Sequence, residues 1–384
     1  MMRPERDARG RARSLLMLLL CLPLAASAAQ LRLESVLGEP AAGDGAPLEF
    51  ARAEGVRSFV FPEDHGPHPR FRSEWWYLTV NLEDAAGAWY GVQFTAFRQA
   101  LRPDDAASSP WSDSQLYLGH LALTDVRGGR HLEAERLARG HPRLAGARAE
   151  PFRVWVDGWS LGAAETARIG GAQLPPLFLQ GRADAFAVSL ELVPVKPLVL
   201  QGDRGLSRKG PEQASYYYSV PRLAASGTIQ VAGGTRQVTG TGWLDREWST
   251  SLLSSGQQGW DWFGLQLDGA EELMAFQLRR DDGQRDPFDQ GLWVAADGVS
   301  VALGREDFTL QPLRYWQDER GVSWPVAWQL DLRLPNDRRR YTIEAVLDDQ
   351  RMDTLLTYWE GLVRVLDGQG RTAGKGYMEL TGYE

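Results

Sequence analysis

The sequence predicts an all-β protein built from antiparallel strands. Apolar and polar side chains alternate with a period of two in many short stretches, such as residues 92–97, and this period is typical of half-buried strands. Turn dipeptides such as Asp268-Gly269 separate the stretches. Helical periodicity is limited to residues 132–138 and, more weakly, to 211–215, so we expect few and short helices.

Two hairpin segments suggest that the chain contains a duplication. Residues 75–82 align without gaps to residues 260–267, and each segment continues into an acidic residue, a glycine-containing turn and a second strand that ends in Arg. A chain of 384 residues is also longer than most single hydrophobic cores allow. We therefore predict two related β-barrels packed side by side, over residues 56–250 and 251–384, each with room for a small ligand.

Composition excludes several classes of protein. The formal net charge of −8 argues against a nucleic-acid or anionic-membrane partner. Cys21 is the only cysteine, which excludes a disulfide framework and an iron–sulfur cluster. Glycine-rich phosphate-binding motifs are absent, so no cofactor is expected. Asp64, His65 and His68 could supply metal ligands, but they lie in a turn, and the prediction is a hydrogen-bonding role and no metal.

Residues 1–28 predict a secretory signal peptide. Five Arg among residues 1–13 precede an apolar run of ten residues at 15–24, and a small-residue cleavage site follows. This run is shorter than the roughly 20 residues that cross a bilayer, and no later run reaches that length. A lipidated Cys21 is the alternative, although the small residue wanted before it is missing. We expect a loose leader over 29–55 and a periplasmic protein without an integral membrane segment.

Several motifs run in order from about residue 60 to the C-terminus. They lie at residues 64–68, 74–77, 216–219, 242–249, 259–263, 358–361 and 376–383. On these motifs the chain resembles the AttH/carotenoid 1,2-hydratase-like family of secreted proteins. The resemblance implies two lipocalin-like (calycin) barrels, in agreement with the strand pattern.

The resemblance also implies an activity. Similar proteins hydrate carotenoid double bonds, fungal relatives hydrate a prenyl group or guide cyclisations, and bacterial relatives accompany lipoprotein-export-type ABC transporters. Members are often labelled secreted hydrolases. The carotenoid hydratases carry His where this chain has Arg246, and this difference argues against a carotenoid substrate in particular.

Asp245 and Glu247 are the predicted catalytic residues. They lie two apart in a strand-like stretch and therefore face the same side, with Arg246 on the other side. Two neighbouring carboxylates repel each other, so one of them keeps a proton to higher pH. A protonated carboxyl beside an apolar cavity is the group that protonates an alkene. The alternative is that either carboxylate pairs with an Arg and only stabilises the domain junction.

Aromatic residues at both hairpins and at the Asp245 motif predict a pocket for a lipophilic molecule. Each offers a large apolar surface, and indole faces also stabilise cations. Glu74 and Asp261 lie beside these indoles, where a carboxylate is either part of the pocket or a buried anchor. The predicted ligand-binding residues are Glu74, Trp75, Trp76, Tyr77, Tyr217, Trp248, Trp260, Asp261 and Trp262.

Two functions are compatible with this sequence. The first is an exported lipocalin-like protein that binds an isoprenoid-like or lipid-like molecule and hydrates or isomerises it without a cofactor. The second is a non-catalytic carrier of such a molecule that works beside an envelope ABC transporter permease. Asp245 and Glu247 discriminate between them, because unpaired carboxyls in a cavity favour the enzyme and clamped ones favour the carrier.

Overall fold

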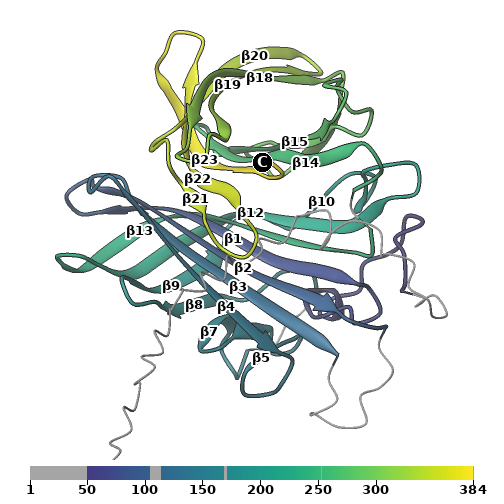
Figure 1. The fold of residues 1–384 in the computed structure, drawn as a ribbon, viewed down its shortest axis with the longest axis vertical. Helices are drawn as coiled ribbons and strands as arrows, with labels where there is room; N and C mark the ends of the chain where they lie inside the picture. The colour runs from purple at the N-terminus through teal and green to yellow at the C-terminus, as the bar shows by residue number, and fades with distance from the viewer. Residues whose placement is uncertain (1–49, 104–113, 168–170, 252, 384) are drawn as a thin grey trace, which may run out of the picture.

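The computed structural model describes residues 50–103, 114–167, 171–251 and 253–383, arranged as two curled antiparallel sheets (Figure 1). The predicted signal peptide, residues 1–28, and most of the leader lie outside the described residues. Among the described residues, no helix is long and apolar enough to cross a membrane. The predicted all-β architecture of two lipocalin-like barrels side by side is confirmed.

The first sheet has the strand order β4-β3-β2-β1-β13-β12-β9-β8-β7-β6-β5, and β10 and β11 also pair with β12. A single turn of 3₁₀ helix, η1 (Glu63–His65), precedes it. Its strands are β1 (Ser73–Asp84), β2 (Trp89–Ala100), β3 (Gln115–Asp125), β4 (Arg130–Arg139), β5 (Ala145–Arg148), β6 (Arg153–Val156), β7 (Trp159–Ala163), β8 (Leu177–Arg182), β9 (Ala187–Pro194), β10 (Val199–Leu200), β11 (Leu206–Arg208), β12 (Ala214–Val231) and β13 (Gly234–Ser249).

The second sheet has the strand order β17-β16-β15-β14-β23-β22-β20-β19-β18, and β21 also pairs with β22. Figure 1 shows it as a ring above the first sheet, with β14, β22 and β23 on the side that faces β1. Its strands are β14 (Gln257–Leu267), β15 (Glu271–Arg280), β16 (Gln290–Val294), β17 (Ser300–Gly304), β18 (Phe308–Gln317), β19 (Ser323–Leu334), β20 (Asp337–Ala345), β21 (Arg351–Met352), β22 (Tyr358–Asp367) and β23 (Thr372–Leu380).

The helical prediction for residues 132–138 is wrong. These residues lie in β4, which pairs along its whole length with β3. The sequence there is rich in Leu, Ala, Glu and Arg, which favour helices. Pairing with a neighbouring strand and packing of Leu132 and Ala134 against the first core override that weak local preference. The weaker helical prediction for residues 211–215 is wrong as well, because residues 211 and 212 form a bend and residues 214 and 215 belong to β12.

The central strands use both of their faces. In β1, Leu78 and Val80 are buried in the core of the first sheet, whereas Tyr77 belongs to a cluster between the sheets. In β14, Phe263 lies in the core of the second sheet and Trp262 in the same intersheet cluster. Alternate side chains of a strand point to opposite faces, so each hairpin serves its own barrel and the junction together.

Equivalent positions of the two aligned segments meet at the junction. Tyr77 and Trp262 occupy matching places in the alignment, and their rings touch edge to face with centroids 5.3 Å apart. Trp243 joins them from β13, 6.2 Å from Trp262. The repeated hairpins therefore face each other across the junction, which is the arrangement expected from a duplicated unit.

Polar bonds also hold the two sheets together. Gln266 on β14 donates to the carbonyl oxygens of Pro221 and Gly242 at 3.0 and 2.9 Å. The Glu272 carboxylate on β15 pairs with Lys196 at 2.6 Å and with Arg222. These contacts fix the relative position of the barrels, and any site between them inherits that geometry.

The closeness of the sheets predicts that Gly91 is sensitive to substitution. A Cβ at this position of β2 would overlap Leu362 and Tyr377 of the second sheet. We expect Gly91→Ala to lower the free energy of unfolding by about 1–3 kcal/mol, as overpacking does, measured by urea denaturation. Gly368→Ala is the control, because nothing lies within 4 Å of its added Cβ. Equal stability of the two variants would contradict the tight junction.

Candidate functional site

A cavity of about 290 Å³ lies between the two sheets. Its wall is mostly apolar, which suits a lipophilic ligand. The apolar part of the wall consists of Trp75, Phe97, Leu116, Leu118, Leu137, Trp260, Trp262, Phe276, Leu278, Leu355 and Leu356. Ionisable and hydroxyl groups on the same wall are Ser73, Glu74, Tyr77, Thr95, Arg98, Lys209, Tyr217, Asp245, Glu247, Tyr358, Glu379 and Thr381.

Asp245 is buried in this wall without a cationic partner among the described residues. Its Oδ1 accepts hydrogen bonds from Ser219 Oγ and from Trp243 Nε1, the latter at 2.7 Å, and its Oδ2 lies 2.8 Å from Tyr217 Oη. Burial raises the pKa of Asp245 to about 7, although the bonds from Ser219, Tyr217 and Trp243 oppose that shift. Asp245 therefore holds a proton up to near-neutral pH.

Tyr217 connects Asp245 to the cavity. The Tyr217 oxygen accepts a bond from Trp262 Nε1 at 3.2 Å, and burial raises the pKa of its hydroxyl well above the usual value. When Asp245 Oδ2 carries a proton, it donates to the same Tyr217 oxygen. The hydroxyl hydrogen of Tyr217, which lines the cavity, is then free to point at a ligand.

Glu247 lies on the same face of β13, as predicted, but in a different environment. Its Oε1 accepts hydrogen bonds from Lys209 Nζ and from Ser215 Oγ. The ammonium of Lys209 lies against this buried carboxylate, and the two side chains form a buried ion pair. Of the two predicted catalytic residues, Asp245 is the one without a cationic partner among the described residues.

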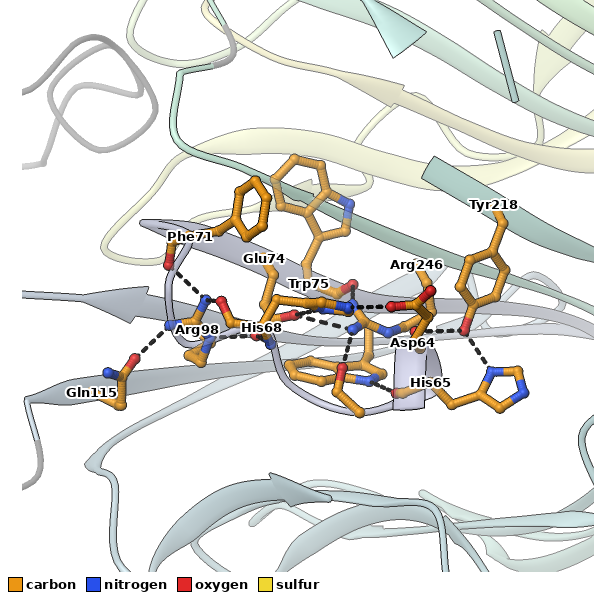
Figure 2. Close-up of polar contacts among 12 residues, drawn as sticks. Asp64, His65, His68, Phe71, Glu74, Trp75, Arg98, Gln115, Tyr218 and Arg246 are labelled. Atoms are coloured by element: carbon orange, nitrogen blue, oxygen red, sulfur yellow. Dashed lines mark hydrogen bonds and ion pairs between the residues drawn. The ribbon is translucent and has the colours of Figure 1, made fainter. Parts of the chain in front are cut away.

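Glu74 lies at the centre of a buried network of charges (Figure 2). Arg98 Nε bonds Glu74 Oε1, Arg246 reaches Glu74 Oε2 at 3.0 Å, and His68 Nδ1 reaches the same oxygen at 3.1 Å. Burial alone would raise the pKa of Glu74, but Arg98, His68 and Arg246 outweigh it and hold the pKa far below the usual range. His68 also bonds Asp64 and stacks on Trp248.

Arg246 faces away from the cavity, as predicted, and binds the N-terminal segment to the first sheet. Its guanidinium carbon lies 3.9 Å above the ring of Trp76, and it donates to the carbonyl oxygens of Trp75 and Gly66 at 2.6 and 2.7 Å. Among the described residues, no group of three or more His, Cys, Asp or Glu side chains could hold a metal ion. His65 instead lies 2.7 Å from Tyr218 Oη.

The structure brings most of the predicted ligand-binding residues to the cavity and separates three from it. Trp76 is buried in the core of the first sheet. Trp248 packs in a cluster with Tyr216 and Tyr218 on the face of β13 that is turned away from the cavity. Asp261 bonds Gln277 and Tyr383 instead of facing the cavity. Those that line the cavity are Glu74, Trp75, Tyr77, Tyr217, Trp260 and Trp262.

Two further carboxyls were missed by the sequence analysis. Glu360 on β22 and Glu379 on β23 are direct cross-strand partners, and Glu379 lines the cavity. Glu379 is the only acidic residue of β23, and Glu360 lies near the start of β22, each among mainly apolar neighbours. That pattern is a signal for a buried carboxyl, but strand pairing between β22 and β23 was needed to show that the two meet.

The fold and cavity define a two-barrel, lipocalin-like protein with a largely apolar cavity between its barrels. The chain belongs to the AttH-like family, which matches residues 52–383. An AttH structure from Nitrosomonas europaea is 34% identical, with a TM-score of 0.74, and the match covers 87% of this chain and all of that one.

The chain is also similar to two proteins named as kievitone hydratases. The structure of kievitone hydratase from Nectria haematococca has a TM-score of 0.62 at 15% identity, over 85% of this chain and 93% of that one, which shows the shared fold. Kievitone hydratase from Fusarium solani subsp. phaseoli is 21% identical over 174 residues, 41% of this chain. The match spans 46% of the length of that curated relative.

The Glu74 network predicts a large loss of stability on substitution. Glu74→Gln leaves the Arg98 and Arg246 guanidinium groups buried without a carboxylate. We expect the free energy of unfolding to fall by about 3–5 kcal/mol, measured by chemical denaturation. Glu83→Gln on the exposed side of the same strand is the control and should change it little. A small effect of Glu74→Gln would show that other contacts hold the N-terminal segment.

Asp245 predicts a pH-dependent stability. Its pKa is raised from 3.8 to about 7 on folding, so between these values the folded state keeps a proton that the unfolded state loses. The free energy of unfolding then falls as pH rises through this window. Asp245→Asn should reduce the slope by up to about 1.4 kcal/mol per pH unit. A stability difference from wild type that stays constant across the window would contradict the assignment.

Proposed function

We propose that the protein binds a lipophilic molecule between its barrels and hydrates or isomerises a carbon–carbon double bond in it. The observation that carries the proposal is the protonatable Asp245 in the wall of an apolar cavity, without a cationic partner among the described residues. A carrier needs the cavity but has no use for a buried, uncompensated carboxyl, which costs free energy of folding.

The apolar wall supports the class of ligand. Phe97, Phe276 and the three Trp of the wall offer faces that exclude water and stabilise a developing carbocation. An acyclic isoprenoid fits this chemistry, because protonation of its trisubstituted alkene gives a tertiary cation. The kinship with kievitone hydratase, a protein named for a hydration, is consistent with that reaction class.

The proton-transfer step follows from the Asp245 contacts. Tyr217 gives its hydroxyl proton to one alkene carbon and receives the proton of Asp245 Oδ2, so the π electrons form the new C–H bond and Asp245 becomes a carboxylate. The cation on the neighbouring carbon then takes up water, for hydration, or loses a proton, for isomerisation. General acid catalysis of this kind contributes about 10²–10⁴-fold in rate.

This mechanism predicts how Asp245→Asn and pH affect turnover. With farnesol as the probe in ¹⁸O-labelled water, mass spectrometry should detect the ¹⁸O-labelled hydrate with wild type. Isomerisation should appear as deuterium incorporation in D₂O. Asp245→Asn should lower the rate about 100-fold or more, and the wild-type rate should fall as pH rises through about 7, because the acid form is lost.

Glu247→Gln is the matched control variant for that experiment. Glu247 shares the strand and face of Asp245 but is paired with Lys209, so this substitution leaves the proposed acid in place. Farnesol retained by wild type and Asp245→Asn alike, without chemical change, would overturn the enzymatic proposal. That result would favour the alternative, a carrier that passes its ligand to an envelope permease. Export through the signal peptide at residues 1–28 is part of both proposals.

A further inference from the structure

The second sheet contributes a pair of carboxyls, Glu360 and Glu379, to the junction. Glu360 and Glu379 lie opposite each other on β22 and β23, and residues so paired have their Cβ atoms about 5 Å apart on the same face. Among the described residues, neither carboxyl forms an ion pair with a Lys, Arg or His. Two like charges this close cannot both persist in a buried site, so the pair holds at least one proton.

The difference in burial between the two carboxyls favours Glu360 as the one that holds that proton. Glu360 is completely buried; its Oε1 accepts from Tyr77 Oη at 2.8 Å, and its Oε2 has no donor. Glu379 Oε1 accepts from Trp260 Nε1 at 2.8 Å. Glu379 is only half-buried and lines the cavity, so a negative charge costs less on Glu379 than on the enclosed Glu360; the shared proton therefore lies on Glu360 and is donated to Glu379. This arrangement leaves Glu379 as the carboxylate, and it is Glu379 that lines the cavity.

The surroundings of Glu379 agree with this distribution. Burial and then Glu379 raise the pKa of Glu360 well above its usual value. Burial raises the pKa of Glu379 to about 7, while the bonds from Trp260 and Glu360 oppose the shift. From the first sheet, Glu247, and Asp245 when it is ionised, act on Glu379 with like charge, and the Lys209 ammonium is paired with Glu247. The Tyr77 and Tyr358 hydroxyls near it stay protonated.

We propose that Glu379 is a second proton-transfer group of the cavity, the base that works with the acid Asp245 from the other sheet, and that Glu360 is the positioning residue that keeps the shared proton. The inference rests on the proposed function. It makes the ligand a molecule held between the two barrels, with the acid supplied by the first sheet and the base by the second.

Asp245, Tyr217 and Glu379 together account for every proton that moves in the proposed hydration. The proton of Asp245, delivered through Tyr217, forms the new C–H bond, and a water oxygen forms the C–O bond at the neighbouring carbon. Glu379 takes the proton that this water loses, so one water adds across the double bond. For isomerisation, Glu379 takes a proton from the carbon next to the cation instead. A proton returning from Glu379 to Asp245 through cavity water restores both groups.

Infrared titration tests the shared proton without any ligand. Between about pH 5 and pH 9, the C=O stretch of protonated carboxyls should contain a component that persists at the upper end and is missing in Glu360→Gln. A component that titrates near neutral pH should be missing in Glu379→Gln and another in Asp245→Asn. A persistent band that Glu360→Gln leaves unchanged would overturn the assignment. Asp261 and Asp289, whose pKa values are also raised, give the same background in every variant.

Turnover of farnesol tests the role of the base. Glu379→Gln should lower the rate about 100-fold or more while farnesol still binds, as followed by Trp fluorescence. Glu360→Gln should lower it less than about tenfold, because its amide N–H donates to Glu379 as the carboxyl O–H did. Full activity of Glu379→Gln would overturn the proposed base. Absence of turnover in wild type together with the expected infrared bands would overturn the proposed function and leave the shared proton in place.

Discussion

The site depends on one geometric constraint, the opposite orientation of successive side chains along a strand. In β1 and β14, one set of side chains fills the strand's own barrel and the other set faces the neighbouring barrel. The side chains that face the neighbouring barrel are buried as well, so the junction is a packed interface and not a solvated surface. It becomes a third core, in which every polar group needs a partner within the protein.

The buried carboxyls of this protein are compensated in two ways. Glu74 and Glu272 each bind two cationic side chains, which makes them anions that fasten segments together. Asp245 and Glu360 receive hydrogen bonds from neutral donors, so a proton is the remaining way to remove their charge. Of these two, Asp245 lines the intersheet cavity, and Glu360 lies beside Glu379, which lines it.

The sequence analysis succeeded where local rules apply. Alternation placed Asp245 and Glu247 on one face of a strand and Arg246 on the other, and this is what β13 shows. It offered pairing of Glu247 and anchoring of Glu74 as alternatives but could not identify the distant partners: Lys209 reaches Glu247 from the loop after β11, and Arg98 and Arg246 reach Glu74 from two other strands. Trp76 and Trp248 also share a motif with cavity residues but face the other way.

The sequence by itself determined the all-β class, the repeated hairpins and the cavity-facing side of β13, because these follow from periodicity and spacing within single segments. The tertiary structure alone decided which carboxyl is free to carry a proton. That depends on burial and on ion pairs between residues far apart in the chain, such as Lys209 with Glu247. The meeting of Glu360 with Glu379 depends on strand register, and the position of Glu379 at the cavity that Asp245 lines depends on the docking of two barrels.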